Sequence, residues 1–454
     1  MRVLFLAVNT EQEPYPVYPL GLSVMAAAVS AAGHAVRVRD ALFSPNFHAG
    51  VAADIADFQP HVIGLSLRNI DNVDSFTVEA HWTLDSLRHT CAVARRLSSA
   101  PLVLGGPGFS LMPEAVLAHC KADYGIAGEG EAAFLALLKT LEGGHLPPKG
   151  LLPRRAAPQT QGWGRAWDDC PLRAHYAEAS GLVCLQSKRG CPHACAYCSY
   201  PILEGRRIRP RDPDEVADEI LFLQRSATFS ELFFTDAVFN DPDGRWLELA
   251  EAMLRRGIRV PWTAFFQPHG LEKDQLALCR ATGLKALELG ADAAADATLA
   301  GLGKHFDFAA VARSVELCRA LDLPTAMYVM FCGPNEDERS LVEGARNLAR
   351  FPDSVIFAFL GVRLYPGTPL HERAAAEGVI FGAQSCLKPV FYHSPGLARK
   401  KADELLRKEL AGRRTVFYPP ENGMARIQAA RALGGRGILW DSLARMSKRR
   451  GKQA

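Results

Sequence analysis

The chain has 454 residues, of which 48% are hydrophobic and 22% are charged, and these are ordinary values for a folded globular protein. This composition excludes a disordered, collagen-like or disulfide-knot chain. Its 52 basic and 49 acidic residues leave a formal charge of only +3, so we expect no nucleic-acid partner. No apolar run reaches the roughly 20 residues that a bilayer requires, and the N-terminus is typical of a first strand rather than a signal peptide. We therefore expect a cytoplasmic protein without a transmembrane segment, built from two or three domains.

The first 145 residues alternate strand-like and helix-like patterns. This alternation predicts a parallel sheet with helices on both faces, in a Rossmann-like domain over residues 1–145. Such sheets bind ligands beyond the carboxyl ends of their strands. The strands are expected at residues 3–8, 35–38, 61–67, 101–104 and 124–127, and the clearest helices at 20–32 and 131–141.

Residues 146–180 contain several Pro, Gly and Trp without clear periodicity, so they are predicted to be a linker. A second α/β series over residues 181–375 predicts an open, partial (β/α)6 barrel. Residues 376–454 are expected to form a small, mostly helical capping region with a helix at 395–410 and a basic tail at 448–450. Barrel strands are expected at 182–186, 231–235, 261–266, 286–289, 326–330 and 355–360, and helices at 213–225, 246–256 and 308–321.

Eleven cysteines in a cytosolic chain are not expected to form a disulfide framework, because that compartment keeps thiols reduced. Three of them, Cys191, Cys195 and Cys198, fall within eight residues directly after the first barrel strand. Another, Cys332, lies in a motif described below. The other seven are expected to be buried small hydrophobes: Cys91, Cys120, Cys170, Cys184, Cys279, Cys318 and Cys386.

The spacing of the three clustered cysteines is suited to an iron–sulfur cluster. A [4Fe–4S] cluster usually takes four cysteines, so a triad leaves one iron open to a substrate or cofactor. Structural zinc is the alternative, but it normally requires four ligands. His193 would be the fourth, although it lies between two of the cysteines and would have to fold back into the same site.

The CxxxCxxC pattern, with Tyr197 just before the last cysteine, resembles the radical S-adenosylmethionine (SAM) superfamily. Later segments resemble this family in the same order: Phe-Thr-Asp at 234–236, Gly-Ala-Asp-Ala at 290–293, Phe-Cys-Gly-Pro-Asn-Glu at 331–336 and Leu-Tyr-Pro-Gly-Thr-Pro-Leu at 364–370. Departures from the family pattern fall at Ala291, Asp292, Cys332 and Asn335.

The resemblance implies that the open iron binds SAM and that an electron, from an external donor such as flavodoxin or ferredoxin, cleaves its sulfonium bond. Tyr197 would pack beside the adenine, or would only support the loop. By the same resemblance, SAM is contacted by Tyr197, Thr235, Asp236, Asp292 and Arg363.

The N-terminal domain resembles the cobalamin-binding domain of B12-dependent radical SAM enzymes in its Pro-Leu-Gly-Leu helix start at 19–22, its Gly105-Gly106 turn and its Gly-Glu-Gly-Glu segment at 128–131. The alternative is that these glycines only form turns. A nicotinamide-type GxGxxG is missing after the first strand, which argues against a dinucleotide. The resemblance implies cobalamin contacts from Leu20, Gly21, Ser66, Arg68, Asn69, Gly105, Gly106, Gly128 and Glu129.

Relatives that supply a histidine to cobalt carry it in the loop after the first strand, but residues 9–18 of this chain contain no histidine. We therefore expect cobalamin without a histidine lower ligand. Our hypothesis is that Arg68 lies under the corrin and opposes water coordination to cobalt; the alternative is an ion pair between Arg68 and a carboxylate at the domain interface.

The resemblance implies a methyltransferase that moves a methyl group from SAM through methylcobalamin to an unactivated carbon. A cyclase or oxidoreductase without methyl transfer shares these features, and a non-enzymatic cobalamin-binding or redox-sensing protein is a third possibility. The substrate is expected to be a small or lipid-like molecule. Candidate acid–base groups are Glu288, Tyr328 and Arg363, with no catalytic residue assigned. Aromatic residues at 378–420 either line a substrate pocket or form a capping core.

Overall fold

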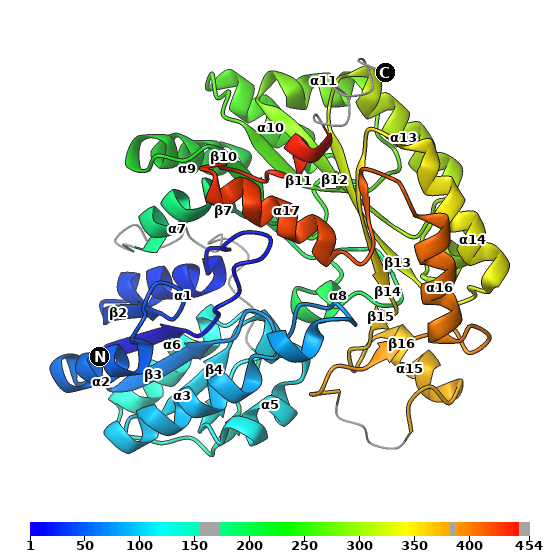
Figure 1. Cartoon of the computed structure of the whole chain (residues 1–454). Helices are drawn as coiled ribbons and strands as arrows, with labels where there is room; N and C mark the ends of the chain where they lie inside the picture. The colour runs from blue at the N-terminus through cyan, green and yellow to red at the C-terminus, as the bar shows by residue number, and fades with distance from the viewer. Residues whose placement is uncertain (155–171, 382–385, 445–454) are drawn as a thin grey trace.

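The computed structural model describes residues 1–154, 172–381 and 386–444. Cys170, the basic tail at 448–450 and part of the expected linker lie outside these described residues. An N-terminal lobe, blue to cyan in Figure 1, lies beside a larger lobe coloured green to orange. Within the described ranges, none of the helices has the length and apolarity needed to cross a membrane.

The N-terminal lobe is a parallel sheet in the strand order β2-β1-β3-β4-β5-β6. Its central strands are continuous apolar runs because helices cover both faces of the sheet. The strands are β1 (Arg2–Ala7), β2 (Ala35–Asp40), β3 (Val62–Ser66), β4 (Leu102–Gly105), β5 (Tyr124–Gly125) and β6 (Gly150–Leu151). The helices are α1 (Leu20–Ala31), α2 (Phe47–Phe58), α3 (Leu84–Leu97), α4 (Pro107–Leu111), α5 (Pro113–Cys120) and α6 (Glu131–Glu142).

The strand order reverses at β1, which has β2 on one side and β3 on the other. In open parallel sheets, ligands bind at such a switch point, outside the carboxyl ends of the strands. The loops after β1, β3, β4 and β5 all meet at this edge. The predicted Rossmann-like domain is confirmed, and its ligand edge is the one that faces the second lobe (Figure 1).

The second lobe is an open barrel with the predicted succession of strands and helices. Its helices begin where the sequence signals it: Asp212 caps α9 by accepting hydrogen bonds from the backbone N–H groups of Asp214 (2.9 Å) and Glu215 (3.1 Å). The strands are β7 (Leu182–Leu185), β10 (Glu231–Phe234), β11 (Trp262–Phe266), β12 (Leu284–Asp292), β13 (Thr325–Phe331) and β14 (Val355–Leu360). The covering helices include α9 (Pro213–Ser226), α10 (Arg245–Arg255), α11 (Lys273–Ala281), α12 (Asp296–Gly301), α13 (Phe308–Ala320) and α14 (Glu338–Asn347).

Two regions differ from the sequence-based expectation. The C-terminal region contributes a parallel strand, β17 (Val416–Phe417), beside β14, so the barrel sheet has a seventh strand. It also holds α16 (Arg399–Glu409) and α17 (Glu421–Ala432), and α17 crosses between the lobes in Figure 1. The expected linker contains β6 and α7 (Leu172–Ser180). A two-residue strand carries too little periodicity to be recognised in the sequence.

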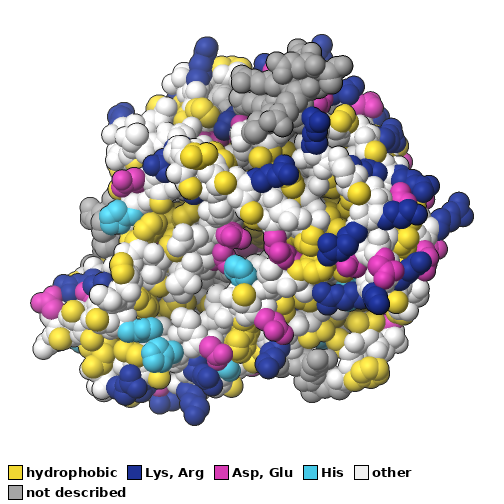
Figure 2. Space-filling model, viewed as in Figure 1, with side chains coloured by type: hydrophobic (Ala, Val, Ile, Leu, Met, Phe, Trp, Pro, Cys, Tyr) yellow, Lys and Arg dark blue, Asp and Glu magenta, His cyan; other side chains and the backbone are white. Residues whose placement is uncertain are grey.

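The aromatic residues of the C-terminal region mostly form a core. Tyr392 and Phe417 are fully buried, whereas Phe381 is 80% exposed. On the face shown in Figure 2, Lys and Arg side chains over α14 and α16 are interspersed with Asp and Glu, so this face carries no extended field of one sign.

The interior of the barrel is closed from one end by the C-terminal segment. Trp440 enters it and donates a hydrogen bond from Nε1 to Oε1 of Glu288 on β12 (3.0 Å). The Tyr328 hydroxyl hydrogen-bonds to the same carboxyl. Burial raises the pKa of Glu288 to about 7, and these two hydrogen bonds only partly oppose that rise.

This arrangement predicts a pH-dependent effect of Glu288→Gln. Between about pH 4.5 and 7, the Glu288 carboxyl is protonated in the native protein but ionised in the unfolded chain. Its contribution to the free energy of unfolding is therefore lost as the pH rises through this range. The variant lacks this loss. In urea unfolding, the free energy of unfolding of the variant minus that of the parent should increase by up to about 3 kcal/mol between pH 4.5 and 8. Glu248→Gln, at an exposed position, is the control, and a pH-independent difference for Glu288→Gln would contradict the prediction.

Candidate functional site

A cavity of about 480 Å³ lies between the two lobes, at the carboxyl ends of the strands of both sheets. The N-terminal lobe contributes the loops after β1, β3, β4 and β5. The barrel contributes the ends of β7, β10 and β11 together with α8 (Tyr200–Leu203). Eight of the residues expected to bind cobalamin line it: Leu20, Gly21, Ser66, Arg68, Gly105, Gly106, Gly128 and Glu129.

The glycine turn after β4 shapes one wall of this cavity. Gly106 has φ +99°, and a Cβ there would lie 2.5 Å from the Leu67 carbonyl oxygen, so a side chain is excluded. The neighbouring Gly105 also lines the cavity, and without a side chain it adds no atoms to the cavity space. These backbone positions fit a bulky nucleotide-bearing cofactor that must approach the chain closely.

Arg68 follows β3 and reaches the cavity wall. With its amide oxygen turned toward Arg68, Asn9 accepts hydrogen bonds from Nη2 (3.0 Å) and Nε (3.2 Å). In the same orientation, Asn9 donates to Oδ1 of Asn69 (2.7 Å). Burial lowers the pKa of the Arg68 guanidinium. Among the described residues, Arg68 forms no ion pair with a carboxylate, so the interface ion pair considered above is not found there.

The three clustered cysteines lie on the loop after β7. The loop is held by a short hairpin of β8 (Lys188–Arg189) and β9 (Arg209–Pro210) and by the bond from the Cys191 backbone N–H to the Gly205 carbonyl (3.1 Å). Cys191 is buried, and Cys195 and Cys198 are half-buried.

The thiols of this loop are close enough to influence one another, and burial raises the pKa of Cys198 to about 12. No three His, Cys, Asp or Glu side chains of the described ranges converge as metal ligands would. The donor set nevertheless fits an iron–sulfur cluster, because a coordinating thiol is deprotonated by the metal itself and no other thiol or disulfide competes in the loop.

Ion pairs join the segment after β5, which carries Glu129 and Glu131, to the β8–β9 hairpin of the cysteine loop. Glu129 pairs with Arg209 and with Arg189 (3.2 Å), and Glu131 pairs with Arg189 (2.9 Å). All four side chains are largely shielded from solvent, from 8% exposed for Arg189 to 32% for Arg209. The loop after β5 in the N-terminal lobe is therefore held next to the cysteine loop of the barrel.

Of the five residues expected to bind SAM, one lines the cavity and two are hydrogen-bonded to each other beside the cysteine loop. Thr235 lines the cavity. Tyr197 donates a hydrogen bond from its hydroxyl to Oδ2 of Asp292 (2.5 Å), and Lys304 donates to the same oxygen. The end of β12 is thereby tied to the cysteine loop.

The other two residues are engaged elsewhere. Asp236 is fully buried and accepts from the backbone N–H of Ser187 (2.7 Å) and Lys188 (3.2 Å), so its carboxylate supports the turn before the cysteine loop. Arg363 pairs with Asp71 of the N-terminal lobe at 2.9 Å, and both side chains are buried. Arg363 also donates to the Leu364 (2.7 Å) and Cys386 (3.0 Å) carbonyls.

Sequence analysis did not identify Tyr15 at the cavity or Lys304 beside the cysteine loop. Tyr15 comes from the loop after β1, lines the cavity and packs its ring 6.2 Å from that of Phe233. The Pro-Tyr-Pro segment around it was the only local signal. None of the C-terminal aromatic residues at 378–420 lines this cavity.

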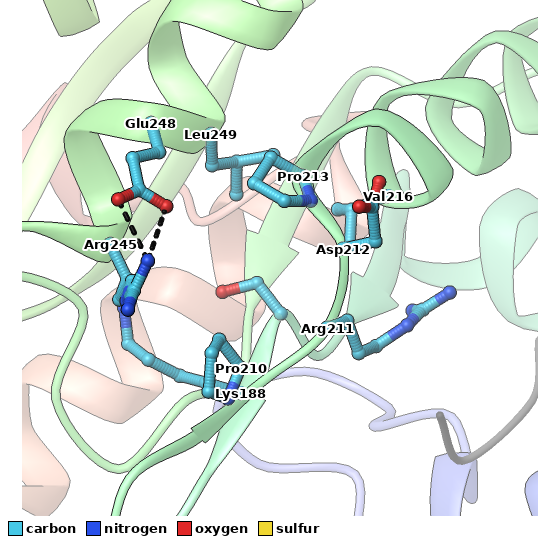
Figure 3. A pocket seen from close by; sticks show the side chains of 10 residues that line it. Lys188, Pro210, Arg211, Asp212, Pro213, Val216, Arg245, Glu248 and Leu249 are labelled. Atoms are coloured by element: carbon cyan, nitrogen blue, oxygen red, sulfur yellow. Dashed lines mark hydrogen bonds and ion pairs between the residues drawn. The ribbon is translucent and has the colours of Figure 1, made fainter. Parts of the chain in front are cut away.

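A second hollow, of about 330 Å³, lies at the N-terminal ends of α9 and α10, behind the cysteine-loop hairpin. Figure 3 shows that Arg245 is paired with Glu248 (2.9 Å) at its edge and that the Arg211 side chain points away from it. Its polar groups are therefore already engaged, and we assign it no ligand.

Comparisons with known proteins agree with this two-part site. Residues 8–138 match the family model of the B12 binding domain, and residues 185–346 match that of the radical SAM superfamily. The chain is 25% identical to a tryptophan 2-C-methyltransferase from Streptomyces laurentii, over 82% of this chain and 74% of the relative. It is 24% identical to an anaerobic magnesium-protoporphyrin IX monomethyl ester cyclase from Synechocystis, over 79% of this chain and 75% of the relative.

Among solved structures, the chain resembles the radical SAM methyltransferase TsrM from Kitasatospora setae, solved with tryptophan and a SAM analogue. The TM-score is 0.83 at 23% identity, with all of both chains covered. This likeness shows that the two proteins share their fold.

Variants of the Arg363–Asp71 pair test whether Arg363 stabilises the contact between the lobes or binds SAM. Removing one partner of a buried ion pair leaves the other charge uncompensated, so Arg363→Met and Asp71→Asn should each lower the free energy of unfolding by about 3 to 5 kcal/mol. The double variant should cost clearly less than the sum, because the second change removes the unpaired charge. Equilibrium unfolding measures this. Additive costs together with a SAM affinity lost only in Arg363→Met would instead make Arg363 a SAM ligand.

Proposed function

We propose that this chain, which belongs to the cobalamin-dependent radical SAM enzymes, is a methyltransferase that transfers a methyl group from SAM to an unactivated carbon of a small molecule. An sp³ carbon with a C–H bond is not a nucleophile, so polar methyl transfer does not reach it. The methyltransferase names among the relatives support this activity.

The single observation that carries the proposal is the shared cavity between the lobes. It is lined by the cofactor loops of the N-terminal lobe and by barrel residues next to the cysteine loop. The ion pairs of Glu129 with Arg189 and Arg209 hold these two sets of loops together. A protein that only carried cobalamin would have no need to place the second set there.

When bound, cobalamin supplies a methyl carrier and the [4Fe–4S] cluster supplies the electron that cleaves SAM. We assign the cluster to Cys191, Cys195 and Cys198, which leave one iron for SAM. We assign SAM contacts to Thr235, which lines the cavity, and to Tyr197 and Asp292, which are hydrogen-bonded to each other. For cobalamin, we assign the eight expected residues that line the cavity, with Asn69 supporting Arg68 through Asn9.

The substrate end of the cavity is aromatic. Phe233, Phe265 and Tyr15 line it, and Phe265 is 36% exposed although it lies on a barrel strand. We propose an apolar or ring-containing substrate, because such a surface binds flat apolar groups well and offers few polar partners. The electron would come from a small redox protein such as flavodoxin or ferredoxin.

A second candidate is a cyclase or oxidoreductase that uses the same cofactors without methyl transfer. The similarity to magnesium-protoporphyrin IX monomethyl ester cyclases favours it, since that similarity covers both lobes. The two candidates differ in the fate of the methyl group of SAM.

An isotope experiment separates them. The anaerobically reconstituted enzyme is supplied with methyl-labelled SAM, reductant and an extract of small metabolites, and products are analysed by mass spectrometry. A methyltransferase gives a product with the labelled methyl group, and replacing all three clustered cysteines by alanine abolishes iron binding and product. A product without label would favour the cyclase, and a wild-type protein that binds no corrinoid would contradict both.

We further propose that cobalamin is bound without a histidine ligand and that Arg68 blocks its lower face. Arg68 is held by Asn9 rather than by a carboxylate among the described residues, so its charge remains directed at the cavity. A guanidinium cannot ligate cobalt, and its bulk and charge disfavour a bound water.

Arg68→Ala should therefore let water reach the cobalt. The visible spectrum of bound cobalamin should shift toward a water-coordinated form, and methyl transfer from SAM should slow by roughly tenfold, the effect of a loss of about 1.4 kcal/mol. Arg68→Lys retains the charge and is the control. Unchanged cobalt spectra and an unchanged rate in Arg68→Ala would remove this role.

A further inference from the structure

Lys304 is a buried cation directly behind the cysteine loop. Its side chain is 4% exposed, and Nζ donates to Oδ2 of Asp292 and lies 3.4 Å from the Tyr197 hydroxyl. It also lies 3.5 Å from the Gly290 carbonyl. The ammonium is therefore fixed by three groups at the end of β12 and in the cysteine loop, and an exposed lysine would not be so constrained.

The backbone around Lys304 packs directly on the cysteine loop. The Ala196 backbone N–H donates to the Leu302 carbonyl (2.8 Å). A Cβ on Gly303, which has φ +71°, would lie 3.0 Å from the Ala194 carbonyl. This contact leaves little room for Lys304 to move without moving the cysteines.

The Lys304 ammonium lies beside the cysteine loop, because it is 3.4 Å from the hydroxyl of Tyr197, the residue that directly precedes Cys198. Its ion-pair partner Asp292 lies on the side of Tyr197, and the ammonium also lies 5.5 Å from the centre of the Tyr197 ring. An opposing charge, Glu204, faces Cys191, but its carboxylate accepts hydrogen bonds from Gly190 (2.9 Å) and Gln186 (2.9 Å). The Lys304 ammonium is thus a fixed positive charge beside the cysteine loop.

We propose that Lys304 is a positioning residue that sets how easily the iron–sulfur cluster is reduced and that holds Tyr197 in place through Asp292. A cluster bound by three thiolates becomes more negative when it accepts an electron. A buried ammonium nearby stabilises that added charge far more than an exposed one, because the permittivity of the interior is low. This role rests on the proposed function only in requiring that the cluster is bound.

Asp292 provides the matched variant. Asp292→Asn retains an oxygen that accepts from Tyr197 but removes the negative charge that offsets Lys304. Lys304→Met removes the positive charge with similar side-chain length, and Lys304→Arg retains it. The two neutralising changes should therefore shift the cluster potential in opposite directions.

The experiment is a redox titration of the reconstituted full-length proteins, followed by electron paramagnetic resonance, with iron content measured on the same samples. At the midpoint potential of the wild type, the ratio of reduced to oxidised cluster should fall by roughly tenfold or more in Lys304→Met and rise in Asp292→Asn, as one unit charge within about 12 Å of the cluster would cause at an effective permittivity of about 20. Lys304→Arg should remain close to the wild type.

Unshifted potentials in Lys304→Met and Asp292→Asn at full iron content would overturn the proposal and leave Lys304 with a purely structural role. Should Lys304→Met fail to hold iron, the Asp292→Asn titration decides alone, and a potential unchanged or lowered there overturns the proposal. A wild-type protein that binds no cluster would instead overturn the proposed function. The iron content of the wild-type protein is therefore measured first, so that failure of the proposed function is distinguished from failure of the role of Lys304.

Discussion

The arrangement of this protein depends on the ion pairs that join its two lobes. Glu129 in the loop after β5 and Glu131 at the start of α6 pair with arginines of the cysteine-loop hairpin, and Asp71 pairs with Arg363. Buried or half-buried ion pairs contribute modestly to net stability, because desolvation offsets much of their attraction. They do fix geometry, since a displaced partner leaves a charge unpaired. We infer that they serve here to set the position of one lobe on the other.

That position determines the chemistry available. The ligand edge of the N-terminal sheet and the open end of the barrel face the same cavity, and neither sheet encloses it alone. Loops from four strands of one lobe supply glycines and Arg68, and the other lobe supplies the Thr235 hydroxyl and the rings of Phe233 and Phe265. The cavity reaches Arg189 and Tyr200 on either side of the cysteine loop, so the proposed cobalamin and cluster sites are neighbours.

The layout of strands and helices was predictable because it depends on local pattern. Continuous apolar runs between Gly-rich turns predicted both parallel sheets, and helices α9, α10 and α13 begin within a residue of their predicted starts, whereas α16 begins at Arg399 rather than at 395. Strand β17 and helix α7 were not anticipated. The two-residue strand β17 forms because it pairs with the edge of β14. Ile356 of β14 pairs with Val416, which is 60 residues away in the sequence, so no local pattern indicates this strand.

The sequence by itself determined the chemical types of the site: three thiols at the spacing of one cluster, and glycines where a cofactor approaches the backbone. These depend on neighbours along the chain. Only the tertiary structure decided which partner each polar side chain has. Arg363 is engaged by a carboxylate 292 positions away, and Asp236 by a turn 48 positions away, whereas Lys304 is brought to the cysteine loop from 107 positions beyond Tyr197. A charged side chain binds the nearest opposite charge in space, and sequence spacing does not record which one that is.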